Sequence, residues 1–560
     1  ITAIVLGDKT WRPFGPFLNP NGLAGYLALT IPVLIALTAG LRGLAAGVKP
    51  GHPSRVAWPV MAFICAIAVA GLLLTASKGA LLGVVAALLV AGLSTRRARW
   101  LAIVAVVAVV AGGLFPTTRA RLAAALSAQK ATSLAFRLHT WLGTARMVAA
   151  RPFLGWGPGT FSRAYPRFAT VPFTQMAHCS WLQMAAEAGI PSALIFLAGL
   201  AWTASAAVSR AQRAEAASIG HHTRRAGARE PPTLVAGAGA LLGSAATLAI
   251  IATLVHNLVD YTWYLPAVSL TTAAIAGTAL GAARDRPPAV SRRSLFCAAA
   301  LVTAAAIAGW QAWANVLADT AAAAASRGYV LSAEDAALLA ARDGVFSPDA
   351  WVTLGKIREA AAGDPPEPEL LLKAAEAYKQ AVVWAPTDPA GWIGAARCLR
   401  LAGKLEEAVT YGASAAAVYP RGPAALLEYA RVLEAIGRTQ DALAVYRRIT
   451  ALADTEYARC PPLEGWADWH IAVAAAAVAR SESRAEAKLA AWRAAARTLR
   501  DYLSWTIHYH QSMQIGGRLD TSLLQDLRGV AVEAAAALAD SRQTEDRVLA
   551  RQLRELCAKL

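Results

Sequence analysis

The residues best suited to chemistry lie in a cationic segment that lacks acids. Residues 116–180 contain eight Lys and Arg residues, among them Arg137, Arg151 and Arg163, and no Asp or Glu. Eight cations without a compensating acid favour an anionic partner, and a guanidinium group can bind a phosphate through two parallel hydrogen bonds. The alternative is contact with the anionic head groups of membrane lipids.

Two further residues lie at the ends of apolar stretches. Lys78 opens "KGALLGVVAALLV", and His178 comes just before "CSWLQM". The positive end of a helix dipole favours a neutral imidazole and a nearby anion, so His178 could accept a proton at the start of a helix. Lys78 could hold a phosphate at the membrane surface. The structural alternatives are a snorkelling lysine and a capping histidine.

His256 and Asp260 form a third candidate group. They are four residues apart, which places both on one face of a helix, and they could orient one another or contact a substrate. An interfacial pair without a chemical role is the alternative. Arg12, in "RPFG", is a further cation near the start of the chain.

The segments around these residues have recognisable patterns. Residues 133–150 read as an amphipathic helix, with Leu134, Leu138 and Leu142 on its apolar stripe. The stretch "PFLGWGPGTF" that follows must be a tight turn, either a cradle of backbone amides for phosphate or a purely structural turn. Glu187 falls inside an apolar stretch, where a carboxylate must be paired or face a cavity.

The apolar runs that carry these candidates predict a membrane domain. The chain has 560 residues, a hydrophobic fraction of 56% and a net charge of +18, and its long apolar runs lie within 1–315. A transmembrane helix needs about 20 mostly apolar residues. Eight segments qualify or nearly qualify: 22–40, 57–75, 77–93, 100–115, 181–208, 233–259, 264–283 and 294–314.

The loop charges predict an orientation for these spans. Lys and Arg cluster in the loops at 42–55, 96–99, 210–229 and 284–293, and such clusters mark the cytoplasmic side. With eight alternating spans, all four clusters fall on the same side. The segment 116–180 and everything after residue 315 are then external.

Other classes of site are not indicated. The six cysteines show no CxxC pair and no metal-like spacing, which predicts neither a zinc site nor a disulfide framework. We expect no metal, no other cofactor and no nucleic-acid partner. The chain begins at Ile1 rather than Met, so we expect an upstream part to be missing.

The second half of the chain carries an internal repeat. The interval between Pro386 and Pro420 is the same as that between Gly403 and Gly437, and alanine recurs at this interval at 374, 408 and 442. The interval is 34 residues, which equals the tetratricopeptide period. In such repeats, small residues let the two helices of a repeat touch. The pattern predicts an α-solenoid, against the alternative of a generic alanine-rich bundle.

Five stretches of the first half resemble, in this order, the O-antigen ligase and O-antigen polymerase family of bacterial envelope glycosyltransferases. They are "RPFGPFLNPNGLAGYLAL", "SKGALLG", "RLHTWLGTARMVAARPFLGWGPGTFSRAYPRF", "AHCSWLQMAAEAGIPSALIFL" and "HNLVDYTWYLP". The resemblance covers about residues 10–280. It implies metal-independent, inverting transfer of a glycan from an undecaprenyl-diphosphate carrier to an acceptor, at the outer face of the bacterial inner membrane.

The resemblance also implies roles for single residues. His178 and Arg137 match the histidine and arginine of the family and would be catalytic, at the attacking hydroxyl and the leaving diphosphate respectively. The arginine of the family's "SRG" is Lys78 here, which keeps the charge but loses the two-pronged fork. The residues expected to bind the diphosphate or the glycan are Lys78, Arg12, Arg151, Arg163, His256 and Asp260.

The resemblance leaves the acceptor open between a lipid in a ligase, a growing glycan in a polymerase and a protein in an O-oligosaccharyltransferase. The alternative outside the enzymes is a non-enzymatic, membrane-anchored scaffold that docks envelope proteins. We expect an all-α chain: a transmembrane bundle of the GT-C type over 1–315, with the external loop 116–180, then a periplasmic tetratricopeptide solenoid over 316–560. Its expected partners are the donor, the acceptor, membrane lipid and an envelope protein on the solenoid.

Overall fold

The computed structural model describes residues 15–17, 19–49, 51–94, 103, 133–172, 174–224, 234–281, 303, 310, 313–344, 347–461, 466–513 and 521–559. The described part is all-helical, with 81% of residues in helices and no strand, which confirms the predicted all-α class. It divides into two compact units, which we describe one at a time.

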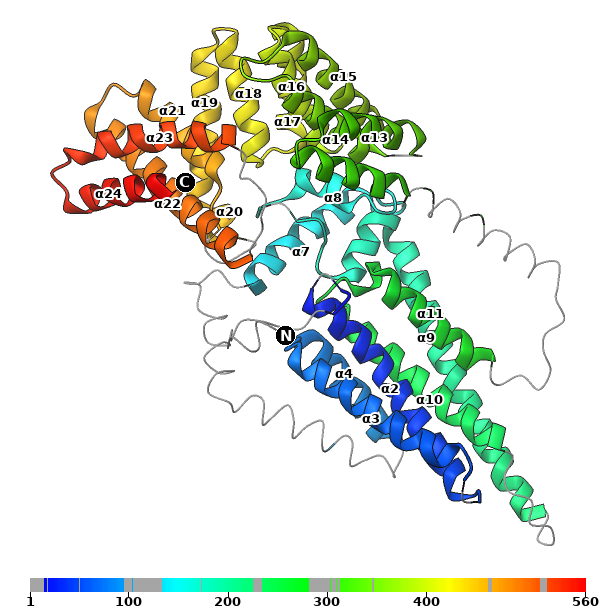
Figure 1. Cartoon of the computed structure of the whole chain (residues 1–560). Coiled ribbons are helices and arrows are strands. Elements are labelled where there is room, and N and C mark those ends of the chain that lie inside the picture. The colour runs from blue at the N-terminus through cyan, green and yellow to red at the C-terminus, as the bar shows by residue number, and fades with distance from the viewer. Residues whose placement is uncertain are drawn as a thin grey trace. The chain divides into compact units, whose positions relative to one another are not determined.

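The first unit is a bundle of apolar helices (Figure 1). Its helices are α2 (Pro20–Ala46), α3 (Ser54–Leu74), α4 (Lys78–Ser94), α9 (Ser180–Arg224), α10 (Leu234–His256) and α11 (Pro266–Gly281), with the short 3-10 helix η3 (Thr262–Tyr264) before α11. Helix α10 packs against α2, α4, α9 and α11. It therefore connects the N-terminal helices to the later ones.

Three of these helices are long and apolar enough to cross a membrane: Pro20–Ala46, Ser54–Leu74 and Ser180–Ala206 of α9. Lys78–Ala91 and Gly243–His256 are shorter apolar helices. Helix α3 exposes large apolar side chains such as Val56, Phe63 and Leu74, as a surface in contact with lipid would.

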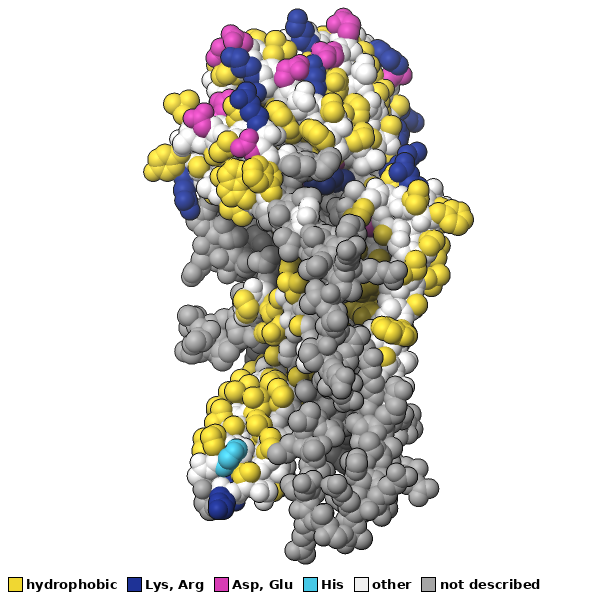
Figure 2. Space-filling model, turned by 90° about the vertical axis from the view of Figure 1, so that its right-hand side faces the viewer, with side chains coloured by type: hydrophobic (Ala, Val, Ile, Leu, Met, Phe, Trp, Pro, Cys, Tyr) yellow, Lys and Arg dark blue, Asp and Glu magenta, His cyan; other side chains and the backbone are white. Residues whose placement is uncertain are grey.

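Helices are present at the predicted spans except 100–115 and 294–314, which lie almost wholly outside the described residues. In Figure 2, hydrophobic side chains cover much of the described surface over the apolar helices, whereas Lys, Arg, Asp and Glu are mixed over the C-terminal helices. The described helices thus have the character of a membrane protein with an additional polar helical part.

The second unit contains α7 as far as Met147, residues 160–175 and the C-terminal helices. Its elements are α7 (Ser133–Ala150), α8 (Phe161–Ala164), η2 (Tyr165–Phe168), α13 (Val330–Asp343), α14 (Pro348–Ala361), α15 (Pro368–Trp384), α16 (Pro389–Leu401), α17 (Leu405–Val418), α18 (Pro423–Ala435), α19 (Thr439–Thr450), η4 (Ala451–Asp454), α20 (Glu456–Arg459), α21 (Trp469–Ser481), α22 (Ala485–Met513), α23 (Thr521–Ala539) and α24 (Thr544–Lys559).

The repeat interval of the sequence corresponds to one antiparallel helix pair. Helices α16 and α18 each begin with proline, at Pro389 and Pro423, which are separated by the same interval as Gly403 and Gly437. These two glycines end the first helix of each pair with the same φ of +78°, which an L side chain rarely adopts. Each helix from α14 to α19 packs against the next, and α16 also packs against α18. The repeat therefore stacks helix pairs in sequence order.

Candidate functional site

Four of the predicted site residues come together at one end of the first unit. Lys78 is the first residue of α4, His178 precedes α9, His256 is the last residue of α10, and Asp260 lies in the turn after it. His256 is fully buried. It lies against two glycines: a Cβ on Gly25 of α2 would lie 2.9 Å from its Cε1, and one on Gly79 of α4 would lie 3.0 Å from its Cδ2. Only residues without a side chain let α2 and α4 approach this ring so closely.

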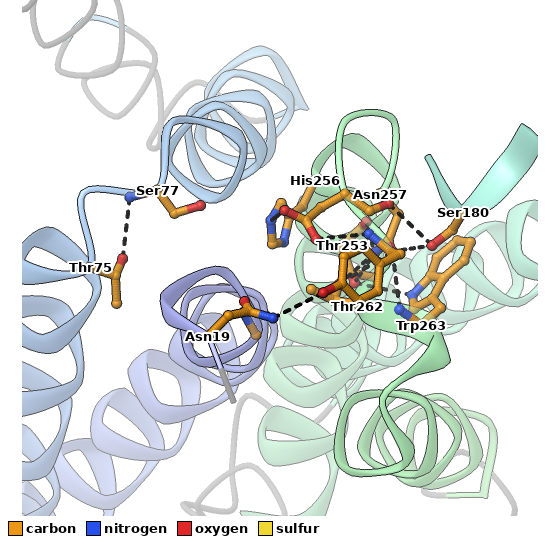
Figure 3. A network of polar contacts seen from close by, with 12 residues as sticks. Asn19, Thr75, Ser77, Ser180, Thr253, His256, Asn257, Thr262 and Trp263 are labelled. Atoms are coloured by element: carbon orange, nitrogen blue, oxygen red, sulfur yellow. Dashed lines mark hydrogen bonds and ion pairs between the residues drawn. The ribbon is translucent and has the colours of Figure 1, made fainter. Parts of the chain in front are cut away.

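Asn257 connects the end of α10 to the start of α9 (Figure 3). The Ser180 hydroxyl donates to Asn257 Oδ1 at 2.6 Å, and the Ser180 amide donates to the Asn257 and Asp260 carbonyls at 3.0 Å. The Asn257 side-chain amide donates to Thr262 Oγ1 at 3.0 Å, and the Trp263 backbone N–H donates to Asn257 Oδ1 at 3.1 Å. A buried side chain satisfied in this way fixes the geometry around it. Asn257 follows His256 directly in "HNLVDYTWY", but no pattern in the sequence marks it as a site residue.

His178 has an unusual backbone. Its φ of +53° lies in the left-handed region, which non-glycine residues rarely occupy. Its ring meets Tyr261 edge to face, with centroids 5.4 Å apart. The Tyr261 hydroxyl accepts from the Asn19 side-chain amide at 3.1 Å, and Asn19 caps α2. His178 is therefore held where α2 and α9 begin, and backbone strain of this kind often accompanies function.

The partner of His256 is Asp260, as the spacing predicts, but the two are loosely joined. His256 Nε2 and Asp260 Oδ2 are 3.9 Å apart, and both side chains are buried. The other carboxylate oxygen of Asp260 accepts from the Tyr261 amide at 2.8 Å. Asp260 thus contacts both the buried imidazole and the turn that carries Tyr261.

Lys78 is exposed at the start of α4. The turn before it includes Ala76 at φ +50°, and the Thr75 hydroxyl donates to the Leu72 carbonyl at 2.6 Å while it accepts from the Ser77 amide at 3.4 Å. Lys78 is the residue directly before Gly79, and Gly79 packs on the buried His256 ring. The structure thus connects the "SKG" and "HN" stretches directly.

The glycine-rich loop after α7 docks on a break in α9. Gly189 has a non-helical conformation (φ +84°, ψ 162°), which frees backbone groups on both sides of the break. The amides of Trp156 and Gly157 donate to the carbonyls of Ala186 and Glu187 at 3.0 and 2.8 Å, and the Ile190 amide donates to the Pro152 carbonyl at 2.8 Å. Because the loop amides donate to carbonyls of α9, this part of the loop acts as a structural turn.

Arg151 lies at the start of this docked loop. Its guanidinium carbon lies 4.2 Å from the centre of the Trp156 ring, a cation–π contact, and the side chain is exposed. The charge stays accessible to an anion while its position is fixed by the loop.

Glu187 is both paired and next to a cavity. The Tyr264 hydroxyl donates to Glu187 Oε2 at 3.1 Å, and the Gln183 amide donates to Oε1 at 3.3 Å. A cavity of about 560 Å³ opens beside it, with walls of mainly apolar side chains from α9 and α11 such as Phe196 and Leu200. Tyr264 lines the same cavity, so the carboxylate and the phenol that donates to it both border this space.

Arg137 and Arg163 belong to the second unit. Arg137 lies on α7, which forms where the sequence predicts a helix. The Arg163 guanidinium is 2.8 Å from Asp349 Oδ2 and 3.8 Å from Asp388 Oδ2, so the C-terminal helices neutralise its charge. Arg12 lies outside the described residues.

The buried face of α7 is not its leucine stripe. Leu134, Leu138 and Leu142 are about half exposed. The buried positions are instead Phe136, Thr140, Gly143, Thr144 and Met147. The two threonine hydroxyls donate to carbonyls one turn earlier in the same helix, so they need no outside partner. Gly143 lets α7 approach the Tyr165 ring, where a Cβ would lie 3.0 Å from the hydroxyl oxygen.

No group of three or more His, Cys, Asp or Glu residues with the geometry of a metal site occurs among the residues that the structure describes. The described end of the first unit contains the His178 imidazole, the Lys78 ammonium group and the buried pair of His256 and Asp260.

Residues 63–197 match the family described as O-antigen ligase. The chain has no match among curated proteins. The matched segment contains Lys78, Arg137, Arg151, Arg163 and His178, whereas His256, Asp260 and the C-terminal helices lie outside it. The match supports glycosyl transfer of the ligase or polymerase type.

Proposed function

We propose that this chain is a membrane glycosyltransferase of the O-antigen ligase type, which transfers a glycan from an undecaprenyl-diphosphate carrier to an acceptor at the outer face of the bacterial inner membrane. One observation carries the proposal. The segment that matches the family supplies Lys78 and His178, and these residues adjoin His256 and Asp260 at one end of the same helical unit. The apolar cavity beside Glu187 supports it further, because a lipid-linked substrate has an apolar part to accommodate.

The proposed reaction is a direct displacement at the anomeric carbon. The acceptor hydroxyl oxygen forms the new bond to that carbon while the bond to the diphosphate oxygen breaks, and the diphosphate leaves with the electron pair. His178 takes the proton of the attacking hydroxyl. A single attack from the opposite face inverts the configuration.

Cations stabilise the charge on the leaving group. Arg137 is assigned to the diphosphate by its match to the family, and its fork can hold two oxygens at once. Lys78 supplies a second positive charge from the start of α4. Arg12, Arg151 and Arg163 are secondary candidates for the glycan or phosphate, although Arg163 would first have to exchange Asp349 for its ligand. His256 and Asp260 keep the packing that positions Lys78 and the start of α9.

The C-terminal helices are proposed to be a periplasmic tetratricopeptide solenoid, because their helix pairs repeat at the tetratricopeptide period. In this proposal the membrane domain spans 1–315 and the solenoid spans 316–560. An envelope protein is the expected partner of the stacked pairs.

The test is transfer from a defined undecaprenyl-diphosphate glycan by the purified full chain in nanodiscs, with a chelator present. His178→Ala should lower turnover by about 10²–10⁴-fold with donor binding retained. Arg137→Ala should weaken both donor binding and turnover, and Arg137→Lys should rescue only part of the loss. His139→Ala and Lys49→Ala are matched controls and should leave transfer unchanged.

The acceptors in this assay separate the alternatives. Transfer to a lipid supports a ligase, to a second carrier-linked glycan a polymerase, and to a protein an O-oligosaccharyltransferase. Rates close to those of the wild type in both His178→Ala and Arg137→Ala would remove these residues from the active site and would favour a non-enzymatic scaffold.

A further inference from the structure

We propose that the second unit contains a saccharide-binding pocket, separate from the transfer site, between α22 and the lining residues within 453–461 and 466–471. The pocket has a volume of about 660 Å³, within the usual range for small-ligand sites. All of its lining residues belong to the second unit. Its occupant is a glycan, bound by ring stacking and by hydrogen bonds to hydroxyl groups.

One wall is a single face of α22. Arg497, Thr498, Asp501, Ser504 and Trp505 line the pocket, and their spacing of i, i+1, i+4, i+7 and i+8 puts them on one side of a helix. This face combines a guanidinium, a carboxylate, two hydroxyls and an indole. A core-packing face would be apolar, whereas this face offers polar groups and an indole to a ligand in the pocket.

The opposite wall contains a carboxylate that is held rigidly. Asp468 accepts from the Tyr457 hydroxyl at 2.7 Å and from the His470 amide at 3.0 Å, and its Oδ1 lies 2.6 Å from His470 Nδ1. Burial raises the pKa of this carboxyl, but the hydrogen bonds from His470 and Tyr457 outweigh burial and keep the pKa below its ordinary value. The group therefore presents a fixed, ionised acceptor to the pocket.

Two tryptophans give the pocket its aromatic surfaces. Trp466 and Trp505 line it from opposite walls, and the Trp466 ring is tilted by 57° against the Tyr457 ring, with centroids 6.4 Å apart. Indole rings offer a large flat surface at a low entropic cost. Such surfaces match the C–H faces of pyranose rings, while the carboxylates and the guanidinium match pairs of neighbouring hydroxyls.

The charges argue against other occupants. The charged groups of the described lining are Arg497, Asp468 and Asp501, and Asp501 also pairs with Arg500 at 2.7 Å. The pocket therefore offers no excess of positive charge to a diphosphate or a polyanion. An acyl chain would offer no hydrogen bonds to the polar side chains of α22 that line the pocket. A peptide on a helical repeat normally lies along an extended concave surface, whereas this pocket is compact and lies beyond the α14–α19 stack.

The experiment uses the full chain in detergent and an array of oligosaccharide fragments from bacterial surface polysaccharides, followed by titration with the best-retained fragment. Trp505→Ala and Asp501→Asn should each weaken binding by at least about tenfold, the loss expected when a stacked ring or a charge-assisted hydrogen bond is removed. Trp384→Ala removes a half-exposed indole from α15 and should bind like the wild type. Circular dichroism establishes that each variant is folded.

Three results would overturn the proposal. They are retention of no fragment by the wild type, equal binding by Trp505→Ala, and retention of an envelope peptide in place of a glycan. The transfer reaction is scored separately, because His178→Ala should lose transfer and still bind the fragment. Failure of the pocket and failure of the proposed glycosyl transfer are therefore distinguishable.

Discussion

Gly25→Ala should destabilise the first unit by pressing on His256. The added Cβ would lie 2.9 Å from His256 Cε1, His256 Nδ1 and Thr262 Cγ2, well inside the 3.4 Å at which ordinary van der Waals contact begins. The ring cannot retreat freely, because it is fully buried and Gly79 already contacts its other edge. Overpacking of this kind costs about 1–3 kcal/mol, and it would also shift α2 away from the proposed site.

The matched control is Gly43→Ala on the same helix. A Cβ at Gly43 meets nothing within 4 Å, so alanine should be neutral or should stabilise by about 0.5–1 kcal/mol through its higher helix propensity. Thermal unfolding of the full chain in nanodiscs, with hydrogen exchange in α10 as the local readout, measures both variants.

A double variant tests the cause. In a His256→Ala background much of the clash at Gly25 is removed, so Gly25→Ala should cost less there than in the wild type. Equal stability of Gly25→Ala and Gly43→Ala, or an unchanged cost in the His256→Ala background, would refute the packing argument.

Three further predictions concern other contacts. Asp349→Ala should cost less than about 1 kcal/mol, because its pair with Arg163 is largely exposed, but hydrogen exchange of residues 160–168 should increase. Arg493, which donates to Asp546, lowers the pKa of that carboxyl from 3.8 to about 2. Between these two pH values the unfolded chain binds a proton at Asp546 that the folded chain does not bind. The pair therefore stabilises the folded chain above about pH 4, and this contribution is lost as the pH falls from about 4 to 2. Asp546→Asn should cost about 2 kcal/mol at neutral pH and flatten that acid dependence in denaturant unfolding. Gly189→Ala should cost at least about 2 kcal/mol in the same unfolding assay, because alanine is strained at φ +84° and its Cβ would overlap the docked glycine-rich loop.

The elements of this fold were largely predictable because they depend on local patterns. A long apolar run such as 57–75 predicts a helix, because inside a membrane the backbone N–H and C=O groups must hydrogen-bond to one another. The repeat was visible because Gly403 and Gly437 need the same backbone conformation. The pattern of α7 predicted a helix correctly, but the buried side could not be predicted, because threonines that bond to their own helix are buried as readily as leucines.

Candidate site residues could be proposed from the sequence, while their contacts in the fold could not. Lys78 and His178 were proposed from their positions at the ends of apolar stretches together with the family resemblance, and their roles stay predictions. The neutralisation of Arg163 by Asp349 could not be foreseen, since the two lie 186 positions apart. Asn257 could not be predicted, because a single sequence does not show which amide side chains will be buried.

The sequence by itself determined the helical class, the apolar spans, the helix-pair repeat and the residue types available for chemistry, because each follows from local patterns along the chain. The tertiary structure alone decided that Gly25 and Gly79 enclose His256, that Asn257 joins α10 to α9, and that the glycine-rich loop closes the break at Gly189. These are contacts between segments far apart in the chain. They depend on which helices pack together, and the free energy of that packing is shared over the whole bundle, so no short pattern records it.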